Sequence, residues 1–265
     1  MSTELFDLTD RVAVVIGGAR DLGRDMAESL ADAGCHLAIT SRQEASAQAT
    51  AQQLQETYGR EVYSAALDIC DYAALSQFAQ DVHQWQGRVD VVVNNAGGGL
   101  GLSTTDLFER KPEDARLLID TNLTGPLFSC QIFGRIMAAQ GSGSIINIAS
   151  IAGLVGRDRR MYQHSGLGQQ PLDYAAAKAG VIGLTMDAAA YLAPMGVRVN
   201  AISPGGFERG QPQAFIDAYS DATALGRMGR DGMDMKGAVR FLASPAADYI
   251  TGHNLVVDGG FCMWK

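Results

Sequence analysis

The sequence predicts an α/β protein, a doubly wound parallel sheet of seven strands with helices on both faces. Short apolar or β-branched runs recur along the 265 residues, and amphipathic segments of helical length separate most of them. Continuous apolar strands joined by helices are typical of a parallel sheet that is covered on both faces. No Pro/Ser-rich linker or charge block divides the chain, which indicates a single domain over 1–265.

The individual elements follow from local patterns. The seven expected strands cover residues 12–16, 36–40, 62–67, 89–95, 144–150, 197–203 and 254–257. The segments 23–34 and 44–59 predict helices that end in glycine, the residue most often found at a helix C-terminus. Further helices are expected from Tyr72, Pro112 and Tyr174. In such a sheet, ligands bind at the carboxyl ends of the strands.

Composition and charge exclude several classes of function. Hydrophobic residues make up 47% of the chain and charged residues 19%, and no apolar run is long enough to cross a membrane. The N-terminal residues MSTELFDLTDRV lack the apolar core of a signal peptide, so we expect a cytoplasmic protein. A formal net charge of -8 argues against nucleic acid as a partner. We therefore expect a small-molecule substrate.

Cysteine and histidine are too scattered to predict a metal site. Cys35, Cys70, Cys130 and Cys262 stand far apart and form no CxxC pair, and the four histidines are equally dispersed. The cysteines are interpreted as reduced, and no metal is expected.

A glycine-rich turn, IGGARDLGRDMAESL, follows the first strand and leads directly into a helix. The glycines at 17, 18 and 23 would let the backbone approach a pyrophosphate, and the free amides of the helix N-terminus would supply donors. Taken alone, the pattern fits a tight strand-to-helix turn about as well as a dinucleotide site.

Tyr174 and Lys178 stand four positions apart in LDYAAAKAGV, so they project from the same face of a helix. A tyrosine with an unperturbed pKa of about 10 becomes a useful base near neutrality if that pKa falls by roughly 3 units, which corresponds to about 4 kcal/mol. A cation about 4 Å away supplies on the order of 4 kcal/mol at an effective dielectric near 20. In an arbitrary protein the same pair most often lies on the surface.

Six further motifs occur in order: LDI at 67–69, NNAG at 94–97, TNLTG at 121–125, NIASIAG at 147–153, YAAAK at 174–178 and SPGG at 203–206. With the glycine turn, they make the sequence resemble the short-chain dehydrogenase/reductase family over nearly its whole length. The resemblance implies a Rossmann fold and a nicotinamide cofactor. The match to the family's TGxxxGxG turn is partial, because Ile16 replaces the threonine and Asp21 replaces the middle glycine.

The resemblance also assigns roles to residues. It implies that Tyr174 is the acid/base, that Lys178 lowers its pKa and holds the nicotinamide ribose, that Ser150 orients the substrate oxygen and that Asn122 completes a proton relay. The residues expected to bind the cofactor are Gly17, Arg20, Leu22, Gly23, Ser41, Arg42, Asp68, Ile69, Asn95, Tyr174, Lys178, Pro204 and Phe207.

The end of the second strand bears on cofactor choice. An acid there binds the ribose 2'-hydroxyl of NAD and repels a 2'-phosphate, but this chain has Ser41 and Arg42. Together with Arg20, these residues favour NADP(H), with NAD(H) possible. Alternatively, Arg42 stacks on the adenine ring, and the protein uses NADP(H) and NAD(H) alike.

The spacing between Ser150 and Tyr174 is about twice that usual in the family. Tyr162 lies at the usual spacing, but no lysine follows it four residues later, so Tyr174 is the predicted base. The extra residues, about 157–172, are interpreted as a non-helical insertion beside the active site. Its Arg157, and Arg209 in an expected substrate lid over 204–225, are candidates for binding an anionic substrate group, although solvated charge is an alternative for each.

The two ends of the chain look most like gluconate 5-dehydrogenase and related sugar-acid or polyol dehydrogenases. The resemblance therefore implies interconversion of a secondary alcohol and a ketone on a sugar acid or polyol, in a homotetramer. A 3-oxoacyl-acyl-carrier-protein reductase is the alternative enzyme. A cofactor-binding regulator that has lost catalysis is the alternative from another class.

Overall fold

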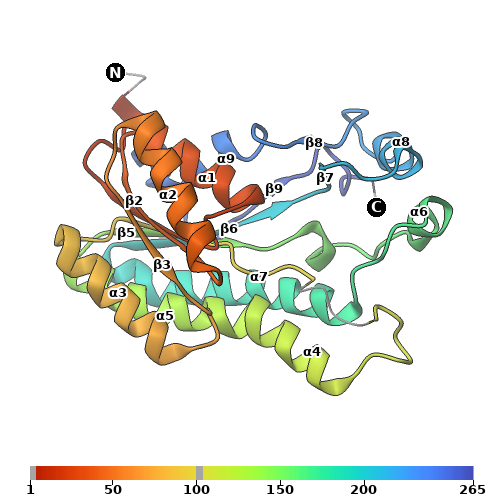
Figure 1. Cartoon of the computed structure of the whole chain (residues 1–265), viewed down its shortest axis with the longest axis horizontal. Coiled ribbons are helices and arrows are strands. Elements are labelled where there is room, and N and C mark those ends of the chain that lie inside the picture. Colours follow the sequence, from red (N-terminus) through yellow and green to blue (C-terminus); the bar gives the residue numbers. More distant parts are fainter. Residues whose placement is uncertain (1–3, 100–103, 265) are drawn as a thin grey trace.

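A parallel sheet of seven strands runs through the centre of the molecule in the order β3-β2-β1-β4-β5-β6-β9 (Figure 1). The computed structural model describes residues 4–99 and 104–264. The strands are β1 Val12–Ile16, β2 His36–Ser41, β3 Val62–Ala66, β4 Val91–Asn94, β5 Gly143–Ile148, β6 Val197–Pro204 and β9 Asn254–Val257. Every pair of neighbours is parallel, so the predicted single-domain, doubly wound fold is confirmed.

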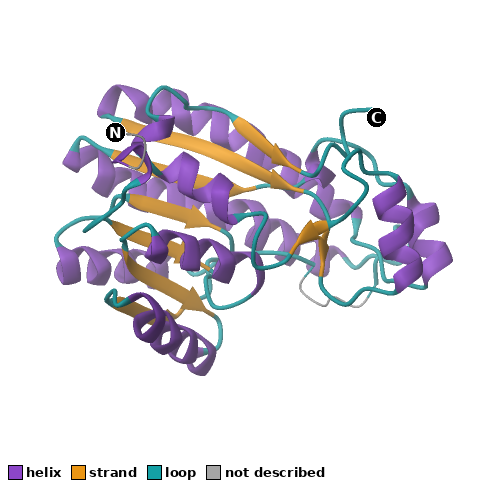
Figure 2. Cartoon of the chain, turned by 90° about the horizontal axis from the view of Figure 1, so that it is seen from above, coloured by secondary structure: helices purple, strands orange, loops and turns teal. Residues whose placement is uncertain are grey.

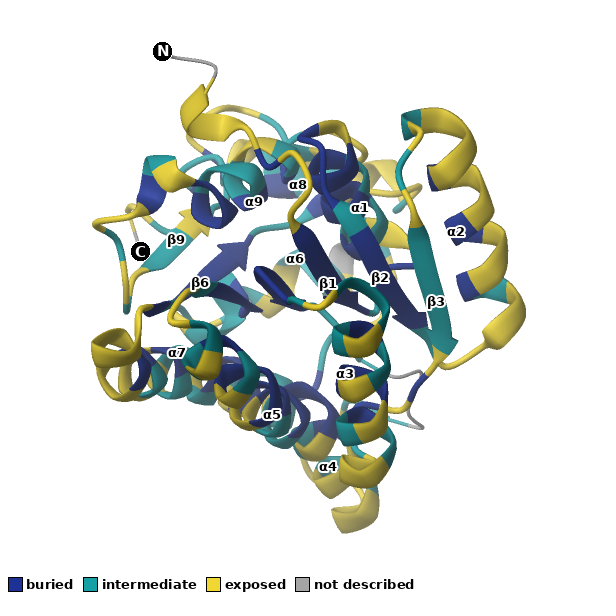
Figure 3. Ribbon diagram, turned by 90° about the vertical axis from the view of Figure 1, so that its left-hand side faces the viewer, coloured by how far each residue is buried: buried dark blue, intermediate teal, exposed yellow. Residues whose placement is uncertain are grey.

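Helices cover both faces of this sheet (Figures 1 and 3). One layer consists of α1 Asp21–Asp32, α2 Glu44–Tyr58 and α9 Lys236–Ala243. The other consists of α3 Tyr72–Gln86, α4 Pro112–Ile119, α5 Gly125–Gln140 and α7 Leu172–Leu192. Gly59 ends α2 in the left-handed conformation, as the sequence predicts. Short 3-10 turns lie at Glu4–Phe6, Ile151–Gly153, Ala193–Met195 and Pro245–Ala247.

The alternation of side chains along each strand divides the core into two halves. Val15 of β1 packs under α1 and α9, whereas its neighbour Val14 packs under α3 and α5. Both are completely buried, as are Met26 of α1 and Phe133 of α5. Burial of each such side chain contributes about 1.5–3 kcal/mol to stability. The two helical layers therefore hold the carboxyl ends of β1, β4 and β5 in fixed positions.

Two short helices lie side by side beyond the carboxyl ends of the strands (Figures 1 and 2). These are α6 Arg159–Ser165 and α8 Gln213–Asp221, and a small second sheet pairs β7 Phe207–Glu208 with β8 Gly229–Arg230. Rings of Tyr162 and Phe215 join the two helices at a centroid distance of 5.1 Å.

The helix α6 corrects the expectation that 157–172 is non-helical. Its first turn is capped by Asp158, whose carboxylate accepts the amide of Arg160 at 3.1 Å, and Gly166 ends it in the left-handed conformation. The apolar anchor that makes so short a helix stable is Tyr162 on Phe215, a contact with a distant part of the chain. No helix in the described ranges is long and apolar enough to cross a membrane.

Candidate functional site

A cleft of about 630 Å³ opens at the carboxyl ends of β1, β2 and β4, where the fold predicts a ligand. Eleven of the thirteen residues expected to bind the cofactor line it: Gly17, Arg20, Leu22, Ser41, Arg42, Asp68, Ile69, Asn95, Tyr174, Lys178 and Pro204. Because these residues come from the first strand-helix turn to the sixth strand, the topology alone brings them together.

The glycine turn is packed too tightly for larger side chains. A Cβ added to Gly23 would lie 2.0 Å from the carbonyl oxygen of Gly17, so Gly23 stands behind the cleft and lets α1 approach the turn. The amide of Gly17 donates to Thr40 Oγ1 at 3.1 Å, and Asn95 Nδ2 donates to the Gly17 carbonyl at 2.9 Å. These contacts fix the turn between β1, β2 and β4.

Asp21 adopts the left-handed backbone conformation at the position where the family's turn has its middle glycine. Its φ of 51° lies in the left-handed region, which aspartate tolerates better than most residues. The half-exposed carboxylate lies 3.7 Å from Arg20 Nε and 3.9 Å from Arg209 Nε. Arg209 pairs more closely with Asp231, at 2.6 Å. The acid that replaces the middle glycine is therefore held between two guanidinium groups at the rim of the cleft.

Three polar side chains meet where the cleft reaches the end of β5. Tyr174 and Lys178, one turn apart on α7, both face the cleft, and Lys178 Nζ lies 5.7 Å from the Tyr174 ring centroid. Ser150 follows β5, and its hydroxyl acts on the Tyr174 hydroxyl, whose pKa it lowers. Lys178 Nζ donates to the carbonyl of Ile148 at 2.7 Å.

Burial dominates the proton affinities at this centre. It raises the pKa of Tyr174, while the hydrogen bond to Ser150 and the nearby guanidinium of Arg157 lower it. Burial lowers the pKa of Lys178 to about 8. The Lys178 ammonium donates to Ile148, and Arg157 is the cation that lowers the pKa of Tyr174; the lowering expected from Lys178 stays a prediction.

Asn122 lies in a π-helical turn, Asp120–Thr124, which joins α4 to α5. π-helical turns are frequent at functional sites. Its side chain is fully buried, accepts the Gly98 amide at 2.9 Å, and donates to the carbonyls of Gly98 and Leu118 at 3.1 and 3.0 Å. A Cβ on Gly97 would lie 2.5 Å from Asn122 Oδ1 and 3.6 Å from Lys178 Nζ, so only a glycine separates the two side chains.

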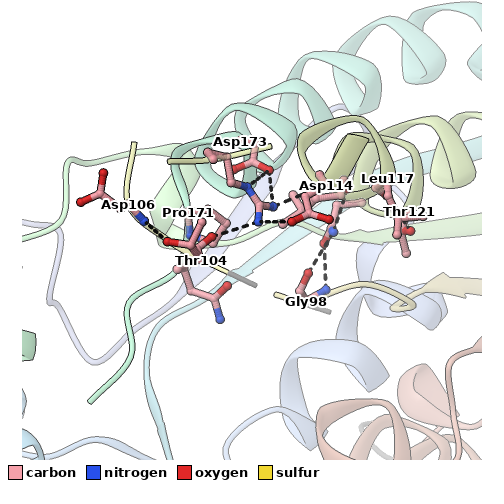
Figure 4. Close-up of polar contacts among 12 residues, drawn as sticks. Gly98, Thr104, Asp106, Asp114, Leu117, Thr121, Pro171 and Asp173 are labelled. Atoms are coloured by element: carbon pink, nitrogen blue, oxygen red, sulfur yellow. Dashed lines mark hydrogen bonds and ion pairs between the residues drawn. The ribbon is translucent and has the colours of Figure 1, made fainter. Parts of the chain in front are cut away.

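A buried ion pair holds the start of α7 next to Tyr174. The guanidinium of Arg110 binds Asp173 at 2.7 Å and the carbonyl of Thr104 at 3.0 Å, and it lies 3.7 Å from Asp114 (Figure 4). The side chains of Arg110 and Asp173 are each 8% exposed. This cluster joins the chain before α4 to the residue that precedes the tyrosine.

A second cavity of about 280 Å³ adjoins Ser150 and Tyr174 on the side away from the glycine turn. Its walls come from the segment 157–172, from α8 and from the C-terminal region: Arg157, Met161, Tyr162, Phe215, Tyr219 and Phe261. Sequence reasoning named Arg157 as a substrate candidate but missed the apolar residues, because only the tertiary fold brings them together.

Two of the expected cofactor residues lie outside the larger cleft. Phe207 is buried in the core under α1 and α9 and lines neither cavity, and Gly23 supports the turn from behind. Arg209 lines the larger cleft beside Asp21 and not the smaller cavity, and its binding of the substrate stays a prediction. In the described ranges, no group of three or more His, Cys, Asp or Glu side chains is placed to hold a metal ion.

Comparisons with known proteins show which family and which folds the whole chain is similar to. The family model described as "Enoyl-(Acyl carrier protein) reductase" matches residues 17–262. The chain is 35% identical to 3-oxoacyl-(acyl-carrier-protein) reductase FabG of Vibrio harveyi, over 97% of this chain and 99% of that protein. It resembles the structure of a gluconate 5-dehydrogenase from Burkholderia cenocepacia in complex with NADP and tartrate, with a TM-score of 0.89, 31% identity and 99% of each chain covered. It also resembles the structure of gox2181, with a TM-score of 0.90 and 33% identity over 100% of each chain.

The doubly wound sheet and its polar centre at the end of β5 define an oxidoreductase of the dinucleotide-binding type. The chain belongs to the short-chain dehydrogenase/reductase family, whose members use NAD(P).

Proposed function

We propose that this protein is an NADP(H)-preferring dehydrogenase that interconverts a secondary alcohol and a ketone on a small carboxylic acid, with sugar acids such as gluconate as the class implied by sequence. The observation that carries the proposal is the placement of Ser150 and Tyr174 between a dinucleotide-sized cleft and a smaller cavity. A substrate in the smaller cavity would meet the cofactor at these two residues.

The residues that line the larger cleft fit a dinucleotide. Gly17 and Gly23 keep side chains out of the turn, and the N-terminus of α1 faces the same region. When bound, the nicotinamide would accept or give the hydride. Lys178 would hold its ribose, and Arg20 and Arg42 would meet a 2'-phosphate on the adenosine side.

The chain's own residues would handle the proton. In the oxidation direction, the Tyr174 oxygen takes the proton of the substrate hydroxyl, and the Ser150 hydroxyl holds the substrate oxygen in line. Lys178 lies beside Tyr174 and only Gly97 separates it from Asn122, so a relay through these groups and water would carry the proton toward solvent. Reduction uses the same groups in reverse.

The choice between the two enzyme candidates depends on the roof of the smaller cavity. Sequence relatives include 3-oxoacyl-acyl-carrier-protein reductases, and a structural neighbour was solved with tartrate, a small hydroxy acid. Here α6 and α8 meet through Tyr162 and Phe215 across the substrate side. A roof of this kind suits a small free acid better than a long thioester arm, which favours the first candidate.

The deciding experiment follows the oxidation state of the nicotinamide with a panel of sugar acids, polyols, small hydroxy and keto acids, and acetoacetyl-coenzyme A. We expect turnover of an acid in the panel. Tyr174→Phe should lower kcat by about 10²–10⁴-fold, the usual contribution of a general acid/base, and leave cofactor binding unchanged. Cofactor binding without turnover of any compound would favour the regulator, and preference for the thioester would favour the reductase.

Cofactor preference has its own test. Arg42→Asp places an acid at the end of β2, where it would repel a 2'-phosphate and accept the 2'-hydroxyl of NAD. We expect the KM for NADP(H) to rise about 10-fold or more with little change for NAD(H), and equal effects on both would contradict the preference.

The assembly and the location stay predictions. We propose a homotetramer, because large apolar side chains are exposed on two separate regions of the surface. One region is on α4, α5 and α7, and the other surrounds the edge strand β9. The cytoplasm remains the predicted compartment.

A further inference from the structure

Building on the proposed reaction, we propose that the substrate is a hydroxy acid or keto acid with an apolar remainder, and that Arg157 binds its carboxylate. This inference concerns the smaller cavity beside Ser150 and Tyr174. Within the small carboxylic acids of the proposed function, it favours acids that carry a hydrocarbon group over sugar acids.

Arg157 is placed where it can meet a group close to the reacting carbon. Its guanidinium carbon lies 5.5 Å from the centroid of the Tyr174 ring, and the side chain lines the smaller cavity. Nη1 donates to the carbonyl of Gln170 at 2.7 Å, which holds the guanidinium in position. Nη2 is buried and has no hydrogen-bond partner in the part of the chain that the structure describes.

The charge of Arg157 is also uncompensated. Within residues 4–99 and 104–264, no carboxylate forms an ion pair with it, and burial lowers its pKa. The neighbouring acid, Asp158, is bound by Arg160 at 2.6 Å. A buried cation with an unused donor is costly unless an anion completes it, and a substrate carboxylate would do so with a charge-assisted hydrogen bond.

The remaining lining is mostly aromatic and aliphatic, with the polar side chains of Asp158, Gln170 and Gln211 also at the wall. Ring contacts run in an unbroken row from Tyr162 to Phe215, Tyr219 and Phe261, with centroid distances of 5.1, 5.9 and 4.5 Å. The Tyr219 hydroxyl already accepts the amide of Gly206 at 2.6 Å.

A polyhydroxylated chain would therefore place hydroxyl groups against the aromatic row. Each hydroxyl left without a hydrogen-bond partner there would cost about 1–3 kcal/mol of binding free energy. A hydrocarbon group gains about 25 cal/mol for every Å² that it buries there. The cavity volume of about 280 Å³ is at the lower end of small-molecule sites, so the apolar group is small.

The test compares three probes that differ in charge and polarity: 2-oxo-4-phenylbutanoate, the neutral ketone 4-phenylbutan-2-one, and 5-oxogluconate. We measure kcat/KM for their reduction by NADPH with the wild type, Arg157→Gln, Arg157→Lys and Arg159→Gln. Arg159 belongs to the same segment but its side chain is exposed and hydrogen-bonds to Gln169, so it is the matched control.

We expect the wild type to prefer the apolar keto acid over both other probes. Arg157→Gln should lower kcat/KM for that acid by about 10–100-fold, the value of a charge-assisted hydrogen bond, and change the neutral ketone less than about 3-fold. Arg157→Lys should retain part of the preference, and Arg159→Gln should resemble the wild type.

Each other result overturns the inference. Equal losses for the acid and the neutral ketone would mean that Arg157 acts through Tyr174 or through the fold, and faster turnover of 5-oxogluconate would refute the apolar remainder. If the wild type reduces none of the three probes but turns over another compound of the wider panel, the inference fails and the proposed function stands. If nothing in either panel is turned over, the proposed function itself fails.

Discussion

Lys178 places a charged group at a buried position, and this lowers the stability of the folded protein by an amount that can be measured. The side chain is 3% exposed, and its pKa is lowered to about 8. Below that pH the folded protein holds a buried ammonium that the unfolded chain keeps in water. The lysine that we propose binds the cofactor therefore destabilises the fold.

We expect Lys178→Met to raise the free energy of unfolding by about 1–3 kcal/mol at pH 7 while abolishing turnover. The gain should be constant below pH 8, shrink between pH 8 and 10.5 as the buried lysine loses its proton before the unfolded one, and vanish above that range. Urea unfolding at several pH values measures it. A gain that does not change with pH would mean that packing, and not charge, is responsible.

Asp21 is the second residue whose charge opposes its position. Near the N-terminus of α1 it repels a pyrophosphate, although Arg20 and Arg209 partly compensate it. We expect Asp21→Gly to tighten NADP(H) binding about 5-fold, or about 1 kcal/mol, measured by titration of nucleotide fluorescence. Asp32→Asn removes the same charge at the far end of α1 and should leave the affinity unchanged. Tightening by both variants would indicate an effect of net charge alone.

Sequence reasoning located the residues of the dinucleotide cleft because they belong to local motifs. Gly17 and Asp68 follow strands and Ser41 ends one, and the parallel topology then places the strand ends together. It did not reveal the ion pair of Arg209 with Asp231, which comes from a turn that no motif connects to it. The direction of the pKa shift of Tyr174 could not be predicted either. Burial raises this pKa, and the spacing of residues in the sequence does not reveal burial.

Among the elements, α7 depends on a buried ion pair as well as on its own sequence. Arg110 fixes Asp173 in the first turn of α7, directly before the proposed base. Removing one member of such a pair leaves the other charge buried without compensation, at a cost of about 3–5 kcal/mol.

We therefore expect Arg110→Met to destabilise the protein by about 3–5 kcal/mol and to lower kcat, because the start of α7 loosens. The double variant Arg110→Met/Asp173→Leu removes both charges and should recover most of the stability. Thermal unfolding of the three proteins gives the comparison. If the double variant were as unstable as the single one, the pair would stabilise the protein through packing of its side chains and not through its charges.

The strands were predictable to within a few residues, whereas the elements that complete the substrate cavity were not. Val12–Ile16 and Asn254–Val257 begin and end where their apolar runs do. The helix α6 depends on Tyr162 meeting Phe215, more than fifty positions away, and β7 and β8 are two residues each. Short elements held by tertiary contacts leave almost no local pattern.

At the scale of the whole molecule, large apolar side chains are exposed both on the helical layer of α5 and α7 and at the edge strand β9. Leu127 of α5 and Tyr191 of α7 are 47% and 73% exposed on one helical layer. Val256 lies on β9, the strand at the edge of the sheet, and is also exposed. Two self-complementary patches on one chain generate a closed tetramer with two kinds of interface, and an unpaired edge strand is itself a place for contact.

Sedimentation should therefore give a wild-type species of about four times 28.1 kDa. The pair Leu127→Glu/Tyr191→Glu buries charge in the helical interface and should stop assembly at the dimer, because the β9 interface is intact. Val256→Lys should also give dimers, and the combination of all three should give monomers. Gln55→Glu, on the exposed face of α2, adds a charge outside both patches and should leave the tetramer whole. A wild-type monomer, or a tetramer that survives all three substitutions, would contradict this arrangement of interfaces.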